Sequence, residues 1–529
     1  MKILPASGLL FACSVLALNA APAAGGFTTF SNKSAVVRQA SPKEKPFLLY
    51  PACPCYHAVG EGNGDTRIDA RVNIEPEQRA GFRLVVELTD ANGKQLQTAS
   101  ADASKAEIVG VNLRVPNSSP AVFGVRARLL NGSEKEVAQA TTDVHVIPGE
   151  LATVRMGPDG FLRVAGKPEF PLGMYSAAKY DEMGKAGFNA THSYAITVGE
   201  TNELINITDI RLKQLLDNSW SNGMRMMVEL PRKPIEKAQW QQVSRRILTF
   251  RHHPGLLCWA SEERVARGAA PLTNMAKLYR LVKDLDPNHP LVLGDTKDKI
   301  QKLQTDRRDF FPDPCMDAGI WWWYPIPIRP AKTNALEGQE KTAELQLQPP
   351  SWLTTTISKK PLWIAIQSYQ KPAQDARFPT PGEYRCQAYL SIINGVKGLF
   401  FYTGSGQKDF EGKPAGLINK PVEGHWDYVK QLVGELKEFS PVVMAPAGSI
   451  KLDMSPANAL VEFTTRQYDG NLYVVAANKS AIQQNVRFSG AAIKGKRLEV
   501  LYEGHQAKLN GEVLSDEFAP YGVHVYKLN

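Results

Sequence analysis

Short apolar segments alternate with longer stretches of helical periodicity through the middle of the chain. Eight of these segments are candidate strands, at residues 170–175, 188–194, 225–230, 256–261, 291–295, 318–324, 362–367 and 398–403. The stretches between them repeat apolar residues at a period near 3.6, as at Trp240, Val243, Ile247 and Phe250. Eight such units match the size of a closed barrel of parallel strands. We therefore expect a (β/α)8 TIM barrel over residues 150–440.

The regions on either side of this barrel have a different pattern. Apolar and polar positions alternate in short runs at both ends of the chain, for example at Phe82 to Leu88 and at Leu472 to Ala477. Turn sequences separate the runs, at Asp90 to Gly93, Asn131-Gly132 and Asp469-Gly470. The fold class predicted is thus α/β, with a barrel flanked by an N-terminal all-β sandwich at 46–148 and a C-terminal one at 447–529.

The first residues have the features of a secretory signal. Lys2 precedes an apolar stretch, and small residues follow from Ala20 to Gly26. We expect residues 1–24 to be removed and the mature protein to be secreted or periplasmic, because no later apolar run is long enough to span a bilayer. A lipid anchor at Cys13 is a less favoured alternative, since the apolar run before it is short.

Composition excludes some classes of function. The chain is 43% hydrophobic and 22% charged, which is typical of a folded protein. Its formal charge of +9 is scattered among acids without a basic stripe, so nucleic acid is not an expected partner. The five cysteines after Cys13 cannot all pair, and Cys258 and Cys386 lie in apolar patterns typical of packed thiols. Cys53 and Cys55 have no accompanying cluster at zinc spacing, so we predict no metal site and no cofactor.

Acids and aromatic residues gather at the predicted ends of the barrel strands. In such barrels these ends form one mouth, where the chemistry takes place. Cleavage of a glycosidic bond needs two carboxyl groups, and aromatic faces hold sugar rings. The candidates for catalysis are Glu262, Glu263, Glu229 and Asp295, and those for substrate binding are Tyr175, His192, Tyr194, Trp321, Trp322, Trp323, Tyr324 and Gln367. Strand alternation places at least one of the three tryptophans in the core.

One segment resembles a motif of a known enzyme clan. Residues 251–263 (RHHPGLLCWASEE), followed by 285–290 (LDPNHP), resemble the fourth strand and neighbouring helix of the retaining barrel glycoside hydrolases that include β-galactosidases and cellulases. In that clan the motif ends in a Glu that is the general acid/base, a role that the resemblance gives to Glu263. The clan's nucleophile is a Glu at the end of strand seven, where this chain has Gln367, which cannot form a glycosyl ester.

The sequence therefore leaves two main readings open. The first is a glycoside hydrolase that acts on an extracytoplasmic polysaccharide or glycoconjugate, with Glu229 or Asp295 as the second carboxyl group. The second is a carbohydrate-binding protein on a hydrolase scaffold that has lost its nucleophile. In a third, the β-domains mediate adhesion and the barrel is a spacer. The acids themselves could instead be structural, with Glu262 and Glu263 paired to nearby arginines, Glu229 to Arg225 and Asp295 to Lys297.

Overall fold

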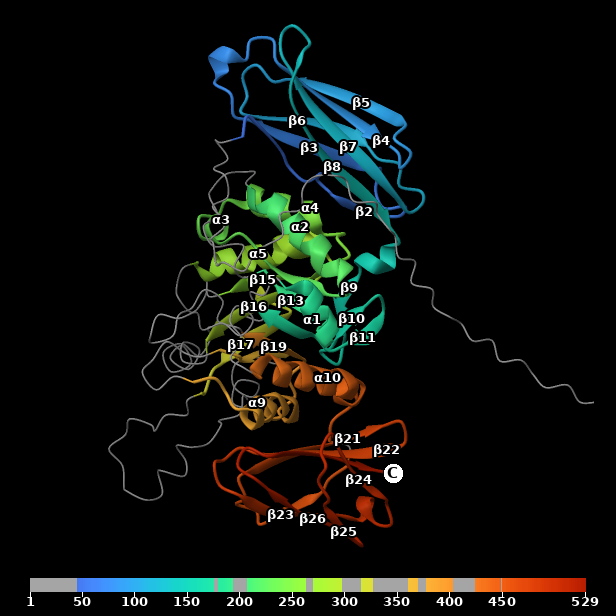
Figure 1. Cartoon of the computed structure of the whole chain (residues 1–529), viewed down its shortest axis with the longest axis vertical. Helices are drawn as coiled ribbons and strands as arrows, with labels where there is room; N and C mark the ends of the chain where they lie inside the picture. The colour runs from blue at the N-terminus through green and yellow to red at the C-terminus, as the bar shows by residue number, and fades with distance from the viewer. Residues whose placement is uncertain are drawn as a thin grey trace, which may run out of the picture. The chain divides into compact units, whose positions relative to one another are not determined.

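The structure is a computed structural model of the whole chain (Figure 1). It describes residues 45–175, 179–193, 207–262, 270–296, 315–326, 360–369, 377–402, 424–448 and 450–529, apart from the side chains of residues 207, 272, 295 and 296. No helix within these ranges is long and apolar enough to cross a membrane.

Eight parallel strands close into a barrel in sequential order. They are β12 (Leu172–Tyr175), β13 (Ala190–His192), β14 (Arg225–Glu229), β15 (Leu256–Glu262), β16 (Leu291–Thr296), β17 (Ala318–Trp323), β18 (Leu362–Gln367) and β19 (Gly398–Tyr402). The helices between and after them are α1 (Tyr180–Ala186), α2 (Ile207–Ser221), α3 (Arg232–Glu236), α4 (Trp240–Phe250), α5 (Leu272–Leu285), α9 (Pro381–Ile393) and α10 (His425–Met444). The predicted barrel is confirmed, because each candidate strand overlaps one of these eight.

Apolar side chains cover both faces of the barrel wall, one layer inside the barrel and one layer outside it. Alternate strand residues point inward, so that Tyr175, Met227, Ala260 and Phe400 belong to the interior cluster. Their neighbours along the strands, such as Met226, pack outward against the helices. Strands covered on both faces are nearly continuous apolar runs, which is why these segments lack a polar alternation.

The N-terminal region forms two sheets. One has the order β1-β3-β6 and the other β2-β8-β7-β4-β5. Their strands are β1 (Phe47–Leu49), β2 (Tyr56–Ala58), β3 (Asp65–Val72), β4 (Arg83–Thr89), β5 (Gln95–Asp102), β6 (Ile108–Arg114), β7 (Ala121–Leu130) and β8 (Glu136–Ile147). Asp90 and Asn131 organise the predicted turns, since each side-chain oxygen accepts two backbone N–H groups. A small antiparallel sheet, β9 (Val154–Met156), β10 (Leu162–Val164) and β11 (Lys167–Glu169), precedes the barrel.

Polar contacts join these sheets to the barrel helices. Arg245 of α4 pairs with Asp69 of β3 at 2.7 Å, and both side chains are largely buried. The hydroxyl of Tyr56 in β2 donates to Asp217 of α2 at 2.8 Å. These contacts connect β2 and β3 with the helices α2 and α4.

The C-terminal region forms two four-stranded sheets, as its alternating pattern predicts. Their orders are β20-β23-β26-β25 and β21-β22-β27-β24. The strands are β20 (Asp453–Ser455), β21 (Val461–Tyr468), β22 (Asn471–Asn478), β23 (Gln484–Ser489), β24 (Leu498–Leu501), β25 (Lys508–Asn510), β26 (Val513–Phe518) and β27 (Val523–Leu528). Asp469 and Gly470 both have positive φ, of 48° and 73°, as the two-residue hairpin turn between β21 and β22 requires.

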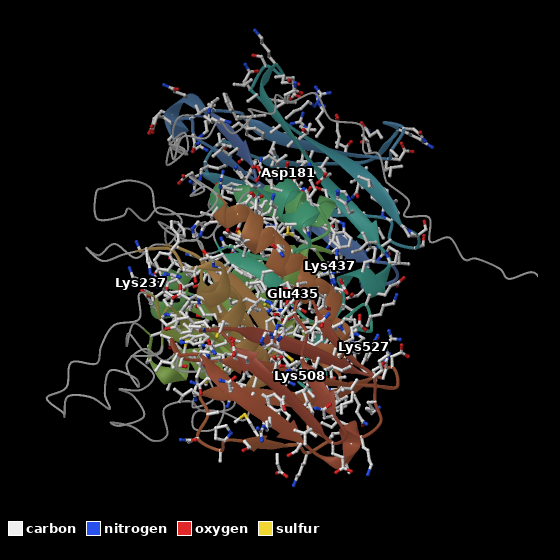
Figure 2. All side chains as sticks on the ribbon, turned by 60° about the horizontal axis from the view of Figure 1, so that its bottom comes forward. Asp181, Lys237, Glu435, Lys437, Lys508 and Lys527 are labelled. Atoms are coloured by element: carbon white, nitrogen blue, oxygen red, sulfur yellow. The ribbon has the colours of Figure 1, made fainter. Side chains whose placement is uncertain are left out.

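The second of these sheets shares its core with the barrel. Val475 and Val525 belong to the same apolar cluster as Tyr389 of α9. At this boundary Glu435 of α10, labelled in Figure 2, accepts hydrogen bonds from Tyr389 (2.6 Å) and Arg385 (2.9 Å). Cys53, Cys55, Cys258, Cys315 and Cys386 are free thiols, and the expectation that Cys258 and Cys386 are packed in the core is confirmed.

Candidate active site

Four of the predicted site residues meet in one buried cluster at the carboxyl ends of four consecutive strands. Tyr175 ends β12, His192 ends β13, Glu229 ends β14 and Glu262 ends β15. All four side chains lie on the inward face of the barrel wall and are 2% exposed or less. The closed barrel brings them together because parallel strands end at the same edge.

Two polar side chains lie against one carboxylate oxygen of Glu262. The Tyr175 hydroxyl donates to its Oε1 at 2.7 Å, and His192 Nε2 lies 2.9 Å from the same oxygen. The Tyr175 and His192 rings stack with their centroids 4.2 Å apart. Burial and the charge of Glu262 raise the pKa of Tyr175 well above its usual range, so the phenol keeps its proton and remains a donor.

Glu229 lies in a different environment. Its Oε1 accepts from Arg232 Nε at 2.9 Å and from the backbone N–H of Glu262 at 3.2 Å. Its Oε2 is buried and has no hydrogen-bond partner among the described residues. Burial, followed by the charge of Glu262, raises the pKa of Glu229 from 4.5 to about 7. Glu229 therefore holds a proton near neutral pH, with Oε2 the oxygen free to carry it. Its cation partner is Arg232 and not Arg225, the structural partner that the sequence suggested.

The two carboxyl groups are close enough to act on one bond. One oxygen of Glu229, one oxygen of Glu262 and one ring nitrogen of His192 all lie within 4.8 Å of one another. When two neighbouring carboxyl groups have different environments, their pKa values move apart. One can then act as an acid and the other as a base in the same site. The same donor set could also ligate a divalent cation. However, Arg232 already supplies a positive charge to this pair, 2.9 Å from Glu229.

Tyrosines form the other side of the mouth. Tyr324, just beyond β17, stacks on Tyr402 at the end of β19 with centroids 5.2 Å apart, and Tyr369 lies edge-on to both. Tyr324 and Tyr402 are half-buried. Tyr402 is also 5.9 Å from Tyr175, which connects the tyrosines to the acids. The sequence analysis missed Tyr369 and Tyr402, although Tyr402 lies within the predicted eighth strand.

The three consecutive tryptophans of β17 do not all face the same way, because successive side chains of a strand point to opposite faces. Trp322 points into the barrel, whereas Trp321 and Trp323 pack in the outer layer against the helices. This corrects the inclusion of all three among the substrate-binding candidates, because adjacent residues on β17 cannot share one face. Trp322 approaches Glu262: a side-chain carbon built on Gly294 would meet Glu262 Cγ at 3.0 Å and Trp322 Cη2 at 3.2 Å.

Gln367 is engaged by backbone groups. Its Oε1 accepts from the N–H of Ile326 at 2.9 Å, while its Nε2 donates to the carbonyls of Ile326 (2.7 Å) and Tyr369 (3.1 Å). In the structure Gln367 therefore fixes the segments that follow β17 and β18. Both amide hydrogens are engaged, whereas Oε1 keeps a second lone pair, so the assignment of Gln367 as a substrate-binding residue stays a prediction.

Three candidates cannot be placed. Glu263 and Tyr194 lie outside the described residues, and of Asp295 only the backbone is described, paired in register with Trp321. Their roles stay predictions.

A cleft of about 500 Å³ opens at the opposite end of the barrel, near the starts of β17, β18 and β19. Its two acids are already bound to cations, Asp317 to Lys283 at 2.6 Å and Asp159 to Arg163 at 2.7 Å. Because barrel chemistry takes place at the carboxyl ends of the strands, we give this cleft no catalytic role.

No known protein family matches the chain. Among solved structures it is similar to an FMN-binding β-glucuronidase from Facaelibacterium prausnitzii L2-6, with 11% identity over 91% of this chain and 71% of that chain, and a TM-score of 0.40. It is similar to an α-amylase from Geobacillus thermoleovorans, with 12% identity over 66% of this chain and 91% of that chain, and a TM-score of 0.47. A β-glucuronidase from Bacteroides uniformis has 11% identity over 93% of this chain and 62% of that chain, and a TM-score of 0.41. By name these are glycoside hydrolases.

Proposed function

We propose that this protein hydrolyses glycosidic bonds, with Glu229 as general acid/base and Glu262 as nucleophile. The observation that carries the proposal is the buried pair of carboxyl groups in opposite environments. Glu229 has a raised pKa of about 7 and an unbonded Oε2, while Glu262 receives a hydrogen bond from Tyr175 and lies against His192. A protonated and an ionised carboxyl group in one site is what glycosidic cleavage requires.

The proposed reaction uses a protonated Glu229 and an ionised Glu262. Glu229 gives its proton to the glycosidic oxygen as the bond to the anomeric carbon breaks, and a Glu262 oxygen bonds to that carbon. A water molecule then attacks the anomeric carbon, Glu229 takes its proton, and Glu262 leaves as a carboxylate. The close approach of the carboxyl oxygens, within 4.8 Å, favours this retaining route, because inverting enzymes keep their carboxyl groups about 6.5–9.5 Å apart.

The tyrosines supply a surface for the sugar. Tyr324 and Tyr402 are half-buried aromatic residues beside the acids, and an apolar ring face suits the C–H edges of a sugar ring. Since both carboxyl groups are buried, cleavage requires the mouth to open and admit the substrate.

The test is reducing-sugar release across a panel of polysaccharides and aryl glycosides. Glu229→Gln and Glu262→Gln should each lower turnover by about 10²–10⁴ while leaving substrate affinity nearly intact. Asp159→Asn, at the opposite end of the barrel, is the matched control and should retain full activity. Product analysis by NMR should show retention of the anomeric configuration.

Glu263→Gln belongs in the same series, since the family motif gives the acid/base role to Glu263. Loss of activity in Glu263→Gln alone, with Glu229→Gln as active as the wild type, would transfer the role to Glu263. Undiminished activity in both Glu229→Gln and Glu262→Gln would refute the proposed pair.

One observation favours binding without cleavage. The strand-seven position where related barrels carry their nucleophile is Gln367, and its amide is bound to the backbone. A carbohydrate-binding protein is therefore the second candidate function. Binding to a glycan array with no product from any bound glycan would support it.

The substrate we propose is an extracytoplasmic polysaccharide or glycoconjugate. The support is the signal-like sequence of residues 1–24. N-terminal sequencing of exported protein tests this, and a mature chain that begins at Cys13 with an attached lipid would favour the anchored alternative.

A further inference from the structure

Two histidines and an aspartate converge in the C-terminal β-domain, far in sequence from the acids of the barrel. His505 lies in the loop after β24, Asp516 in β26 and His524 in β27. One ligand atom from each lies within 4.8 Å of the other two. The two imidazole rings are nearly parallel, with centroids 4.5 Å apart, and His505 Nε2 is 2.7 Å from Asp516 Oδ1.

We propose that His505, Asp516 and His524 form a binding site for a divalent transition-metal ion such as Zn²⁺. Two imidazoles and one carboxylate are a donor set that prefers Zn²⁺, Co²⁺ or Ni²⁺ to Mg²⁺ or Ca²⁺, which bind mainly to oxygen. Three protein ligands leave a fourth position for water.

The surrounding hydrogen bonds orient the ligand atoms. His524 Nδ1 is 2.9 Å from Glu503 Oε2, and a proton held there lets Nε2 act as the ligand once Nε2 releases its proton and its contact with the Glu517 carbonyl. The Tyr526 hydroxyl donates to Asp516 Oδ2 at 2.7 Å, while Oδ1 faces His505 and accepts the backbone N–H of Glu517 at 2.8 Å. A carboxylate behind a ligating histidine is the usual outer support of a zinc site.

Small movements would complete the coordination. Tetrahedral ligands about 2.1 Å from a zinc ion lie about 3.4 Å from one another, so atoms within 4.8 Å must approach by up to about 1.4 Å. His505 Nε2 and Asp516 Oδ1, now 2.7 Å apart, must instead separate slightly. His505 can supply this movement, because its side chain is 33% exposed and lies outside the strands, whereas Asp516 is 4% exposed and fixed in β26. His524 Nε2 would give up its 3.2 Å contact with the carbonyl of Glu517.

The site is also connected to the barrel. Glu503, which supports His524, lies 3.3 Å from Arg385 of α9, and Arg385 donates to the carbonyl of Val523 at 2.6 Å. A bound ion would rigidify β27 next to this contact. We therefore expect metal binding to raise the unfolding temperature of the full chain.

The experiment is a titration of the chelator-treated full-length protein with CoCl₂ and ZnCl₂. We expect one equivalent of Co²⁺, with the intense visible absorption of a four-coordinate ion, and its displacement by Zn²⁺. His505→Ala and Asp516→Asn should abolish this spectrum, and Glu503→Gln should weaken the affinity about 10–100-fold, as for other outer supports. His505→Ala is the primary variant because a partly exposed loop side chain is dispensable for folding.

Two controls separate this site from other histidines. His192→Gln removes the histidine of the barrel cluster and His145→Ala removes one in the N-terminal sheets, and both should keep the Co²⁺ spectrum and the shift in unfolding temperature. The proposal is overturned if the wild type binds no Co²⁺ or Zn²⁺ at millimolar concentration. It is equally overturned if folded His505→Ala and Asp516→Asn bind as the wild type does, or if only His192→Gln loses binding.

Discussion

Replacing Glu229 with Gln should change how the stability of the protein depends on pH. In the folded chain, burial and the charge of Glu262 raise the pKa of Glu229 from 4.5 to about 7. In the unfolded chain Glu229 ionises at its ordinary pKa. Between these two pH values the folded chain keeps a proton that the unfolded chain has lost, so the free energy of unfolding falls as the pH rises.

The magnitude follows from the same two values. Each pH unit between 4.5 and about 7 contributes 1.36 kcal/mol, so the wild type loses about 3 kcal/mol across this window and nothing further above it. Glu229→Gln does not titrate. It should therefore be close to the wild type in stability below pH 4.5 and gain about 3 kcal/mol relative to it by neutral pH.

Urea-induced unfolding, followed by tryptophan fluorescence at a series of pH values, measures this difference. Glu383→Gln is a control of opposite sign. Although burial alone would raise the pKa of Glu383, hydrogen bonds from Arg377 and the backbone N–H of Thr380 lower it, so its stabilising effect is lost as the pH falls. A difference between wild type and Glu229→Gln that stays constant with pH would refute the raised pKa and with it the proposed acid.

Gly294→Ala should displace Glu262, because the added carbon would lie 3.0 Å from its Cγ, and we expect lower kcat with a loss of about 1–3 kcal/mol of stability in thermal unfolding. Gln367→Ala removes three bonds to backbone groups, two of them to Ile326, and should destabilise the fold by about 2–4 kcal/mol in urea unfolding. Gln367→Glu with higher activity than the wild type would contradict this structural role. Arg245→Ala breaks a buried ion pair at the N-terminal sheets and should cost about 3 kcal/mol; a calorimetric trace identical to that of the wild type would show that the pair does not hold the two regions together.

Most of the barrel could be predicted from the sequence because buried parallel strands are continuous apolar runs. The prediction for residues 256–261 matches β15 (Leu256–Glu262), and that for 362–367 matches β18 in full. The directions of the side chains were harder to predict from the sequence. A shift of the strand register by one residue decides whether Trp321 or Trp322 faces inward. Only the closed barrel fixes that register, through pairing with β16 and β18.

The parts of the two sites that were missed depend on contacts distant in sequence. Tyr369 and Tyr402 meet Tyr324 through the closure of the barrel, and no spacing along the chain signals this. His505 and His524 likewise come together only because β27 pairs between β22 and β24. Neither pair matches a short metal-binding or catalytic motif.

The shared core between α9 and the C-terminal sheet has a consequence for the order of folding during synthesis. β27 follows every other described strand in the chain, yet it lies inside its sheet, between β22 and β24. Val525 of this strand helps to cover Tyr389 on α9. The ribosome therefore releases the barrel helices before the strand that completes their cover, and an apolar face stays open to chaperones or to misassembly until then. A truncation that removes only β27 should for this reason affect the solubility of the barrel itself.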